Sequence, residues 1–211
     1  MKRDRFQLIV TTLLCFLPAV AGLILYDKLP DRIPVHFDVS GNPDGYAGRL
    51  FGVLGMPAIL AAVNLLVHFS LRTDPKKQNM SPALKFVSYW LAPVLSILLN
   101  GVILAYAMGT KIQITTVVLL FLGILFIVIG NFMPKTKQSY TMGIRLPWTL
   151  ASEENWNRTH RLAGFVWLIG GVAVVLLALL RVTIFWIPLA ILFVMAIIPI
   201  VYSYILYRRG I

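Results

Sequence analysis

The chain has 211 residues, of which 59% are hydrophobic and only 13% are charged. Soluble globular domains contain about 45 to 50% apolar residues, so this composition excludes an ordinary soluble fold. A net charge of +11 would suggest a nucleic-acid partner for a soluble protein, but these basic residues flank apolar segments, where they orient a membrane protein. We therefore expect attraction to anionic lipids and no direct contact with nucleic acid.

Six segments contain no Asp, Glu, Lys or Arg and are long enough to cross a hydrocarbon core, which takes about 20 helical residues. They are 6–26, 51–71, 86–109, 112–132, 162–180 and 182–207. The pattern predicts an all-α integral membrane protein with six transmembrane helices.

The distribution of basic residues predicts how these helices are oriented. Fourteen of the 19 Lys and Arg residues lie at the two termini and in the loops 72–85 and 133–161. The positive-inside rule places these regions in the cytoplasm, which gives an N-in/C-in topology with loop 27–50 outside. The basic N-terminus also resembles a signal peptide, but the apolar residues continue to Leu25, so we expect an uncleaved first helix.

The outer loop 27–50 has the pattern of a small folded element. Pro30 and Pro34 forbid a helix across them, and apolar residues alternate with polar ones from Ile33 to Val39 at the period of a strand. The turn-rich segment 40–45 follows, and a return strand would pass through Tyr46. We therefore predict a structured extracytoplasmic loop with a short β-hairpin.

The sequence offers little for catalysis, metal binding or ion transport. Asp38, Ser40, Asn42 and Asp44 alternate as in a calcium loop, but the glycine falls at position eight and Arg49 at position twelve. Cys15 has no partner cysteine, and the spans contain no Asp, Glu, Lys or Arg, which disfavours an ion-coupled carrier. We expect no metal, no cofactor and no enzyme activity.

The second and third predicted spans contain two asparagines and one histidine. Asn64 and His68 are four residues apart and share one helix face, and Asn100 lies in the third span. Polar groups in lipid need partners, so these side chains are expected to form hydrogen bonds between helices.

The loop 133–161 is the most informative cytoplasmic segment. Met133-Pro134 is expected to end the fourth helix, and Gly143 and Pro147 to keep the residues after them from becoming helical. Ser152, followed by two glutamates, is typical of a helix start. We predict an interfacial cytoplasmic helix with Trp156 at headgroup depth, leading into the fifth span.

These residues resemble the SdpI family of bacterial immunity membrane proteins. The resemblance rests on Pro134-Lys135, Gly143-Ile144-Arg145, Pro147-Trp148-Thr149-Leu150, Trp156, His160-Arg161 and Gly164. The outer-loop segments 29–37 and 41–45 resemble a short domain of unknown function that often precedes this family. Ser139 departs from the pattern, where asparagine is expected. The chain then divides into an N-terminal region 1–85, with helices 1–2 and loop 27–50, and an SdpI-like region 86–211.

The resemblance implies resistance to a secreted antimicrobial peptide that attacks the bacterial cytoplasmic membrane. It also implies a receptor role, in which external toxin leads to capture of an ArsR-type repressor at the inner face. The predicted toxin contacts are Pro34, His36, Phe37, Asp38, Asn42, Asp44 and Gly45. The predicted repressor-docking residues are Gly143, Arg145, Pro147, Trp148, Trp156, His160 and Arg161, although the two arginines could equally bind lipid phosphate. A toxin exporter or flippase, a toxin-modifying enzyme, and a receptor without immunity function are the alternatives.

Overall fold

The computed structural model describes residues 2–182 and 184–211. Within these residues, six helices are long and apolar enough to cross a membrane, which confirms the predicted number of spans. The candidate spans are Asp4–Ile24, Phe51–Thr73, Pro82–Ala107, Ile114–Lys135, Glu153–Leu179 and Trp186–Arg208. The fifth therefore begins nine residues before the apolar segment that predicted it.

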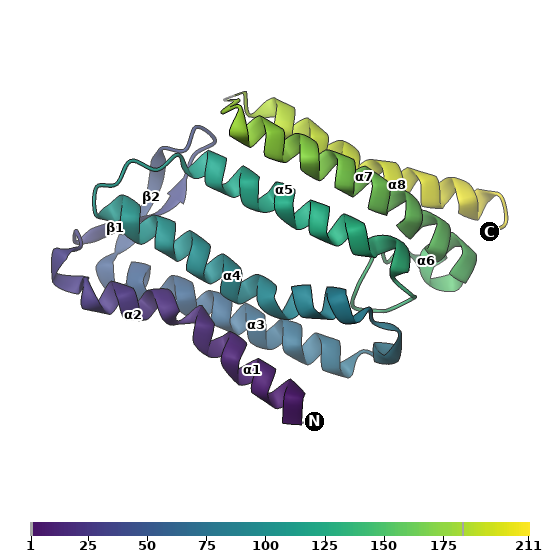
Figure 1. The fold of residues 1–211 in the computed structure, drawn as a ribbon, viewed down its shortest axis with the longest axis horizontal. Coiled ribbons are helices and arrows are strands. Elements are labelled where there is room, and N and C mark those ends of the chain that lie inside the picture. Colours follow the sequence, from purple (N-terminus) through teal and green to yellow (C-terminus); the bar gives the residue numbers. More distant parts are fainter. Residues whose placement is uncertain (1, 183) are drawn as a thin grey trace. The chain divides into compact units, whose positions relative to one another are not determined.

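The chain forms two compact units (Figure 1). The first unit comprises residues up to 70 and residues 86–114. It contains α1 (Lys2–Cys15), α2 (Leu17–Ile24), β1 (Arg32–Phe37), β2 (Pro43–Gly48), a π-helical turn (Phe51–Gly55), α3 (Met56–Thr73) and α4 (Pro82–Ala107). The second unit comprises residues 71–85 and 115–211. It contains α5 (Ile114–Phe132), α6 (Pro147–Ala151), α7 (Glu153–Leu179) and α8 (Trp186–Arg208).

Buried polar side chains join α1 to α3 in the first unit. Asn64 Nδ2 donates hydrogen bonds to the hydroxyls of Thr11 and Thr12, and His68 Nε2 lies 3.0 Å from Thr11 Oγ1. These contacts confirm the prediction of hydrogen bonds between helices for Asn64 and His68. Thr11 was not identified from the sequence, because a threonine in an apolar helix does not by itself indicate a hydrogen bond to another helix.

The prediction was wrong for Asn100. Its Nδ2 donates to the carbonyl oxygen and hydroxyl of Ser96, one turn earlier in the same helix. Ser96 Oγ donates in turn to the carbonyl of Cys15, so Ser96 makes the bond between α4 and α1. An amide side chain can reach its own preceding turn, and the sequence pattern does not distinguish this from a bond to another helix.

The antiparallel hairpin β1–β2 confirms the predicted outer element, and its base is packed on the helices of its own unit. Ile33 is fully buried in a cluster with Leu29, Val53, Ile103 and Leu104. Gly52 allows this contact, since a Cβ at that position would lie 2.9 Å from Ile33 Cβ. Burial of these side chains removes apolar surface from water and fixes the base of the hairpin.

Glycines bring α5 and α7 together in the second unit. A Cβ at Gly130 would lie 2.9 Å from the carbonyl oxygen of Gly164, and a Cβ at Gly123 would lie 2.8 Å from that of Gly171. The two pairs are seven residues apart on both helices, so they recur after two turns. Small residues permit such backbone contact between membrane helices. Figure 1 shows α5, α7 and α8 lying alongside one another.

Two local predictions in the loop 133–161 were wrong. Pro147 begins the short helix α6 instead of preventing one, because a proline at the first helical position has no N–H that the helix needs. From Glu153 the chain forms one continuous helix, α7, where the sequence suggested an interfacial helix that turns into the span. Trp156 is fully buried, so its ring does not face the lipid headgroups. The capping role of Ser152 is confirmed, since its Oγ accepts from the Asn155 N–H.

Candidate functional site

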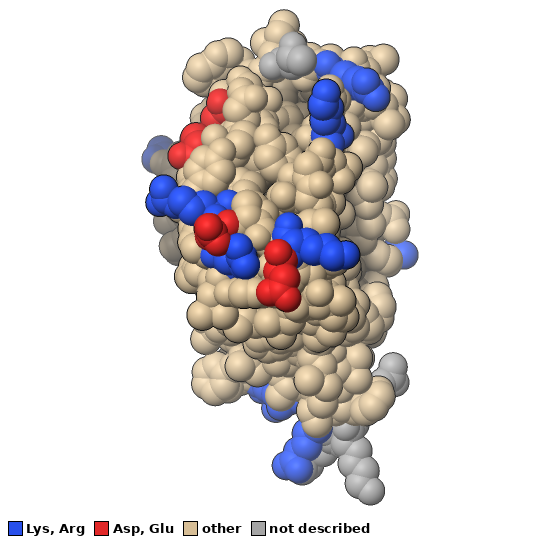
Figure 2. Space-filling view, turned by 90° about the vertical axis from the view of Figure 1, so that its left-hand side faces the viewer, with Lys and Arg blue, Asp and Glu red and all other residues tan. Residues whose placement is uncertain are grey.

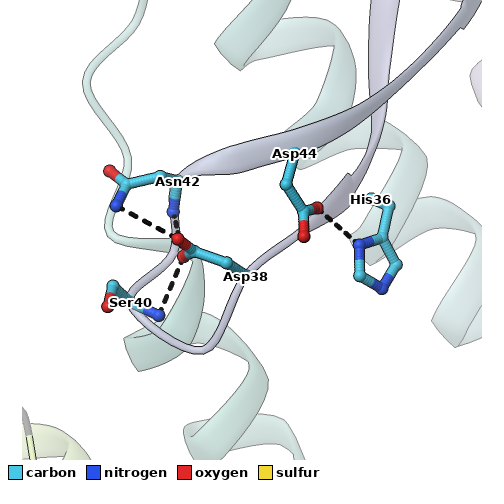
Figure 3. Close-up of polar contacts among 5 residues, drawn as sticks. All are labelled: His36, Asp38, Ser40, Asn42 and Asp44. Atoms are coloured by element: carbon cyan, nitrogen blue, oxygen red, sulfur yellow. Dashed lines mark hydrogen bonds and ion pairs between the residues drawn. The ribbon is translucent and has the colours of Figure 1, made fainter.

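The tip of the hairpin is organised by Asp38 (Figure 3). Its Oδ1 accepts hydrogen bonds from the main-chain N–H groups of Ser40 and Asn42, both at 2.8 Å. The bond from Asn42 is the main reason why the pKa of Asp38 lies below its ordinary value, and it outweighs partial desolvation, which acts in the opposite direction. Asp38 therefore holds the turn in one conformation.

His36 and Asp44 face each other across the two strands. His36 Nδ1 lies 2.5 Å from Asp44 Oδ1, and both side chains reach water (Figure 3). The neighbouring Gly45 is required for this close approach, since a Cβ there would lie 2.8 Å from His36 Cβ. The pair and the glycine thus form one local arrangement on the exposed part of the hairpin.

The structure divides the seven predicted toxin contacts into two groups. Pro34 is buried and Phe37 packs edge-on against Tyr106 of α4, with 5.4 Å between ring centroids, so both anchor the hairpin. His36, Asn42 and Asp44 are exposed, while Asp38 and Gly45 are half-buried. Figure 2 shows acidic and basic side chains near one another in the middle of the face seen there, and basic side chains alone at its lower end.

In the second unit, the predicted motif is built around Trp156 and His160. Their rings stack with centroids 3.9 Å apart, and both side chains are fully buried. Trp156 Nε1 donates to the carbonyl of Thr136, and His160 Nε2 accepts the N–H of Ile144 at 2.9 Å. Two residues of α7 thereby hold both ends of the segment 136–144.

These contacts define the protonation of His160. The Ile144 N–H can donate only to a nitrogen without a proton, so Nε2 is the acceptor and Nδ1 carries the hydrogen. Nδ1 then donates to the carbonyl of Trp156, one turn earlier. His160 is thus neutral and structural, with both ring nitrogens occupied.

Gly143 occupies a position that no other residue fits. Its φ is +104°, in the region that favours glycine. A Cβ there would lie 2.5 Å from His160 Nε2 and 2.8 Å from the Trp156 ring. The exposed Gly143 therefore packs directly against the buried rings of Trp156 and His160.

Asp74 is a site residue that sequence reasoning missed. It lies in the loop between α3 and α4, is only 4% exposed, and accepts the hydroxyl hydrogen of Ser139 at 2.8 Å. Burial of the carboxyl acts to raise its pKa, but hydrogen bonds from Thr141 and Ser139 outweigh this and hold the pKa below its ordinary value. No local pattern around Asp74 indicates such a partner 65 residues away.

Ser139, whose role the sequence left open, connects Asp74 to the motif. Its Oγ accepts the main-chain N–H groups of Thr141 and Met142, both at 3.2 Å. The intervening residue, Tyr140, supplies a carbonyl that accepts a bond from Arg145 Nη1 at 2.6 Å. Asp74 and Ser139 thus fix the turn that holds the Arg145 side chain.

Further missed residues tie this turn to the loop between α3 and α4 and to α6. Thr149 Oγ1 donates to the Ile144 carbonyl and accepts the N–H of Leu146. Gln138 Nε2 donates to the Thr149 carbonyl, and its Oε1 accepts from Lys76 Nζ at 2.9 Å. Thr149 was part of the matched pattern, but only the fold explains why a hydroxyl is needed there.

Trp148 lies against the end of α8. Its Nε1 donates to Ser203 Oγ, and its ring packs against those of Tyr204 and Tyr207 at centroid distances of 5.5 and 5.7 Å. Of the seven predicted docking residues, Gly143, Arg145, Pro147 and Arg161 are exposed, Trp148 is half-buried, and Trp156 and His160 are buried. Arg145, Pro147 and Arg161 are the side chains that a partner could reach directly.

The described residues contain no group of three or more His, Cys, Asp or Glu side chains that could hold a metal ion.

Comparison with known proteins places the buried motif in a family. The sequence model of the SdpI/YfhL protein family matches residues 135–203, which include all seven motif residues. Residues 135–203 therefore resemble the SdpI/YfhL protein family. Residues 13–61, which contain the hairpin, match a domain of unknown function, DUF1648. Asp74 lies between the two matched segments.

A curated relative matches most of the chain. It is the Immunity protein SdpI of Bacillus subtilis (strain 168), which is 27% identical over 171 residues, covering 81% of this chain and 80% of that protein. No solved structure matches. Together with the six membrane-length helices, the SdpI likeness identifies a multi-pass bacterial membrane protein.

Proposed function

We propose that this protein gives the bacterial cell immunity to a secreted antimicrobial peptide. The observation that carries the proposal is the likeness to Immunity protein SdpI over 81% of the chain, together with the presence of both matched segments in order. The absence of a metal-binding group among the described residues is compatible with protection by binding, without chemical change of the toxin.

Survival of sensitive cells tests this proposal. The chain is expressed alone in a Bacillus subtilis strain that lacks its own SdpI, and the cells are exposed to medium conditioned by the wild type. Expression should restore growth, while cells with an empty vector die. Equal killing of both strains, with the protein present in the membrane, would overturn the proposal for this toxin.

The orientation of the chain is part of the proposal. The hairpin follows the first candidate span, and the motif loop follows the fourth, so three crossings separate them. An odd number of crossings puts the two segments on opposite sides of the membrane, and the basic residues around 72–85 and 133–161 place the motif in the cytoplasm. The hairpin then faces the compartment from which a secreted toxin arrives.

We assign toxin contact to the exposed part of the hairpin, where His36, Asn42 and Asp44 are the predicted contacts that reach water. The anchored base makes a preformed surface, and preformed surfaces lose less conformational entropy on binding. Changing Asn42 and Asp44 to alanine should weaken protection and leave the amount of membrane protein unchanged. Protection equal to that of the wild type would remove the hairpin from toxin contact.

A receptor role is the second part of the proposal, and it is favoured by the exposed Arg145 on its fixed turn. In this role, Arg145 and Pro147 contact a cytoplasmic ArsR-type repressor when toxin is bound outside. Toxin can change this surface only if it prefers one of two arrangements of the helices. Arg145→Gln should abolish induction of the immunity operon and preserve survival. If induction and survival are both lost or both kept in this variant, Arg145 does not serve repressor capture separately from toxin protection.

A further inference from the structure

The exposed face of α7 changes from charged to apolar within one helical turn. Phe165, Ile169, Val172 and Leu176 recur at helical spacing, and between 41 and 65% of each side chain is exposed. The glycines at 164 and 171 lie on the other side, against α5. In a membrane, this exposed stripe can only face the acyl chains of lipids.

The same stripe continues toward the start of α7 as Arg161, Arg158 and Glu154, which are all exposed. Arg161 lies four residues before Phe165 and therefore directly above it on the helix surface. The hydrocarbon boundary must fall between these two residues, since the side chains below it are apolar and those above it are charged. Eighteen helical residues from 162 to 179 would then span about 27 Å, close to the thickness of a hydrocarbon core of about 30 Å.

Arg161 differs from its neighbour in its electrostatic partners. Arg158 forms an ion pair with Glu154, one turn earlier, with 2.5 Å between Nη2 and Oε1. Among the described residues, no acidic side chain pairs with Arg161. Its guanidinium is thus uncompensated at the depth where phospholipid phosphates lie.

A second uncompensated cation lies at a similar depth. Pro134 packs on α7 at Gly164, where a Cβ would meet Pro134 Cγ at 2.6 Å. The next residue, Lys135, is exposed, and no acidic side chain of the described residues pairs with it. Two cations near one level favour a headgroup with net negative charge over a zwitterionic one.

We propose that Arg161, assisted by Lys135, binds the phosphate of an anionic phospholipid headgroup at the membrane boundary. A guanidinium can donate two parallel hydrogen bonds to a phosphate, which suits this position. The assignment removes Arg161 from the surface offered to a cytoplasmic protein and leaves Arg145 there. It does not depend on immunity, because it concerns only how the second unit meets the bilayer.

Thermal unfolding in lipid nanodiscs tests the proposal. The purified full chain is placed in discs of phosphatidylcholine alone or with added phosphatidylglycerol, and its Tm is followed by tryptophan fluorescence. Phosphatidylglycerol should raise the Tm of the wild type and of Arg158→Gln, whose native partner is Glu154. Arg161→Gln should lose most of this rise, and Arg161→Lys should keep part of it.

Three results would overturn the proposal: a full rise in Arg161→Gln, an equal loss in Arg158→Gln, or an equal rise when soluble glycerol phosphate is added to phosphatidylcholine discs. The last result would indicate a site for free phosphate. If Arg161→Gln does not fold, Lys135→Gln provides the test. Phosphatidylglycerol must then raise the Tm of Lys135→Gln less than that of the wild type. No toxin is used, so this result and the survival assay can fail independently.

Discussion

Single residues in the motif carry structural roles that their types alone do not reveal. Gly143, Trp156 and His160 form a packed cluster, and the stacked rings leave no space for a side chain at residue 143. The two buried rings of the motif therefore support the exposed residues around them. Arg145 is presented in this way, on a turn fixed from within.

Gly143→Ala should destabilise the second unit. The change adds a methyl group 2.5 Å from His160 Nε2 at a φ of +104°, and such strain costs about 1 to 3 kcal/mol even before the clash is counted. Thermal unfolding in detergent measures the loss. Gly109→Ala is the matched control, because residue 109 also has a positive φ but open space around its Cβ position. A loss no larger than that of the control would show that the packing at Gly143 is unimportant.

Asp74→Asn should weaken the turn at Ser139. The carboxylate accepts from Lys76 N–H on one oxygen and from Ser139 on the other, so an amide group must turn a donor toward one of these donors. Losing a hydrogen bond to a buried charged group costs about 1.5 to 3 kcal/mol. Chemical unfolding would detect this loss, and Asp27→Asn, on an exposed residue, serves as the control. Equal stability of the two variants would contradict the role given to Asp74.

The same carboxyl group predicts a pH dependence. The pKa of Asp74 is held below its ordinary value in the folded protein. The carboxylate therefore adds stability above the pKa that Asp74 has in the unfolded chain, which is about 4. This contribution is lost as the pH falls through the lower pKa of the folded chain. When the pH falls below the pKa of the unfolded chain, the wild type should therefore lose more stability than Asp74→Asn. If the free energy of unfolding falls equally with pH in the two proteins, Asp74 makes no such contribution.

At the scale of elements, the sequence predicted the features with strong local signals. Charge-free segments indicated all six spans, and prolines, alternation and turn residues indicated the hairpin. Prediction from the sequence failed where the partner of a residue is distant in the chain, or where one residue type can play two structural roles. Nothing near Asp74 points to Ser139, a proline can begin a helix as well as block one, and the spacing of Trp156 is the same for a buried and for a lipid-facing face.

Close helix packing in the second unit gives a prediction at this scale. Gly164→Ala should separate α5 from α7, because the added Cβ would lie 2.9 Å from the Gly130 carbonyl oxygen and 2.6 Å from Pro134 Cγ. The Tm should fall clearly. Gly101→Ala in α4, where the Cβ would meet nothing within 4 Å, should be neutral or slightly stabilising because alanine favours helix. A similar response of the two variants would argue against glycine-mediated contact.

In the whole molecule, three candidate membrane spans separate the hairpin from the motif loop. The hairpin tip is held by Asp38, and the motif turn by Asp74 and Ser139, so each exposed segment is fixed by its own side-chain hydrogen bonds. The proposed toxin contact and the proposed repressor capture together require these segments to face different compartments. If they do not, the likeness to Immunity protein SdpI remains but its mechanism must be different.

Labelling of single cysteines in living cells tests this sidedness most directly. Asp44→Cys and Lys137→Cys place thiols at exposed positions of the hairpin and of the motif loop, and the native Cys15 is fully buried, so the unmodified chain is the blank. A membrane-impermeant maleimide should label residue 44 in intact cells and residue 137 only after the membrane is opened. Labelling of both positions in intact cells, or of residue 137 alone, would contradict the account.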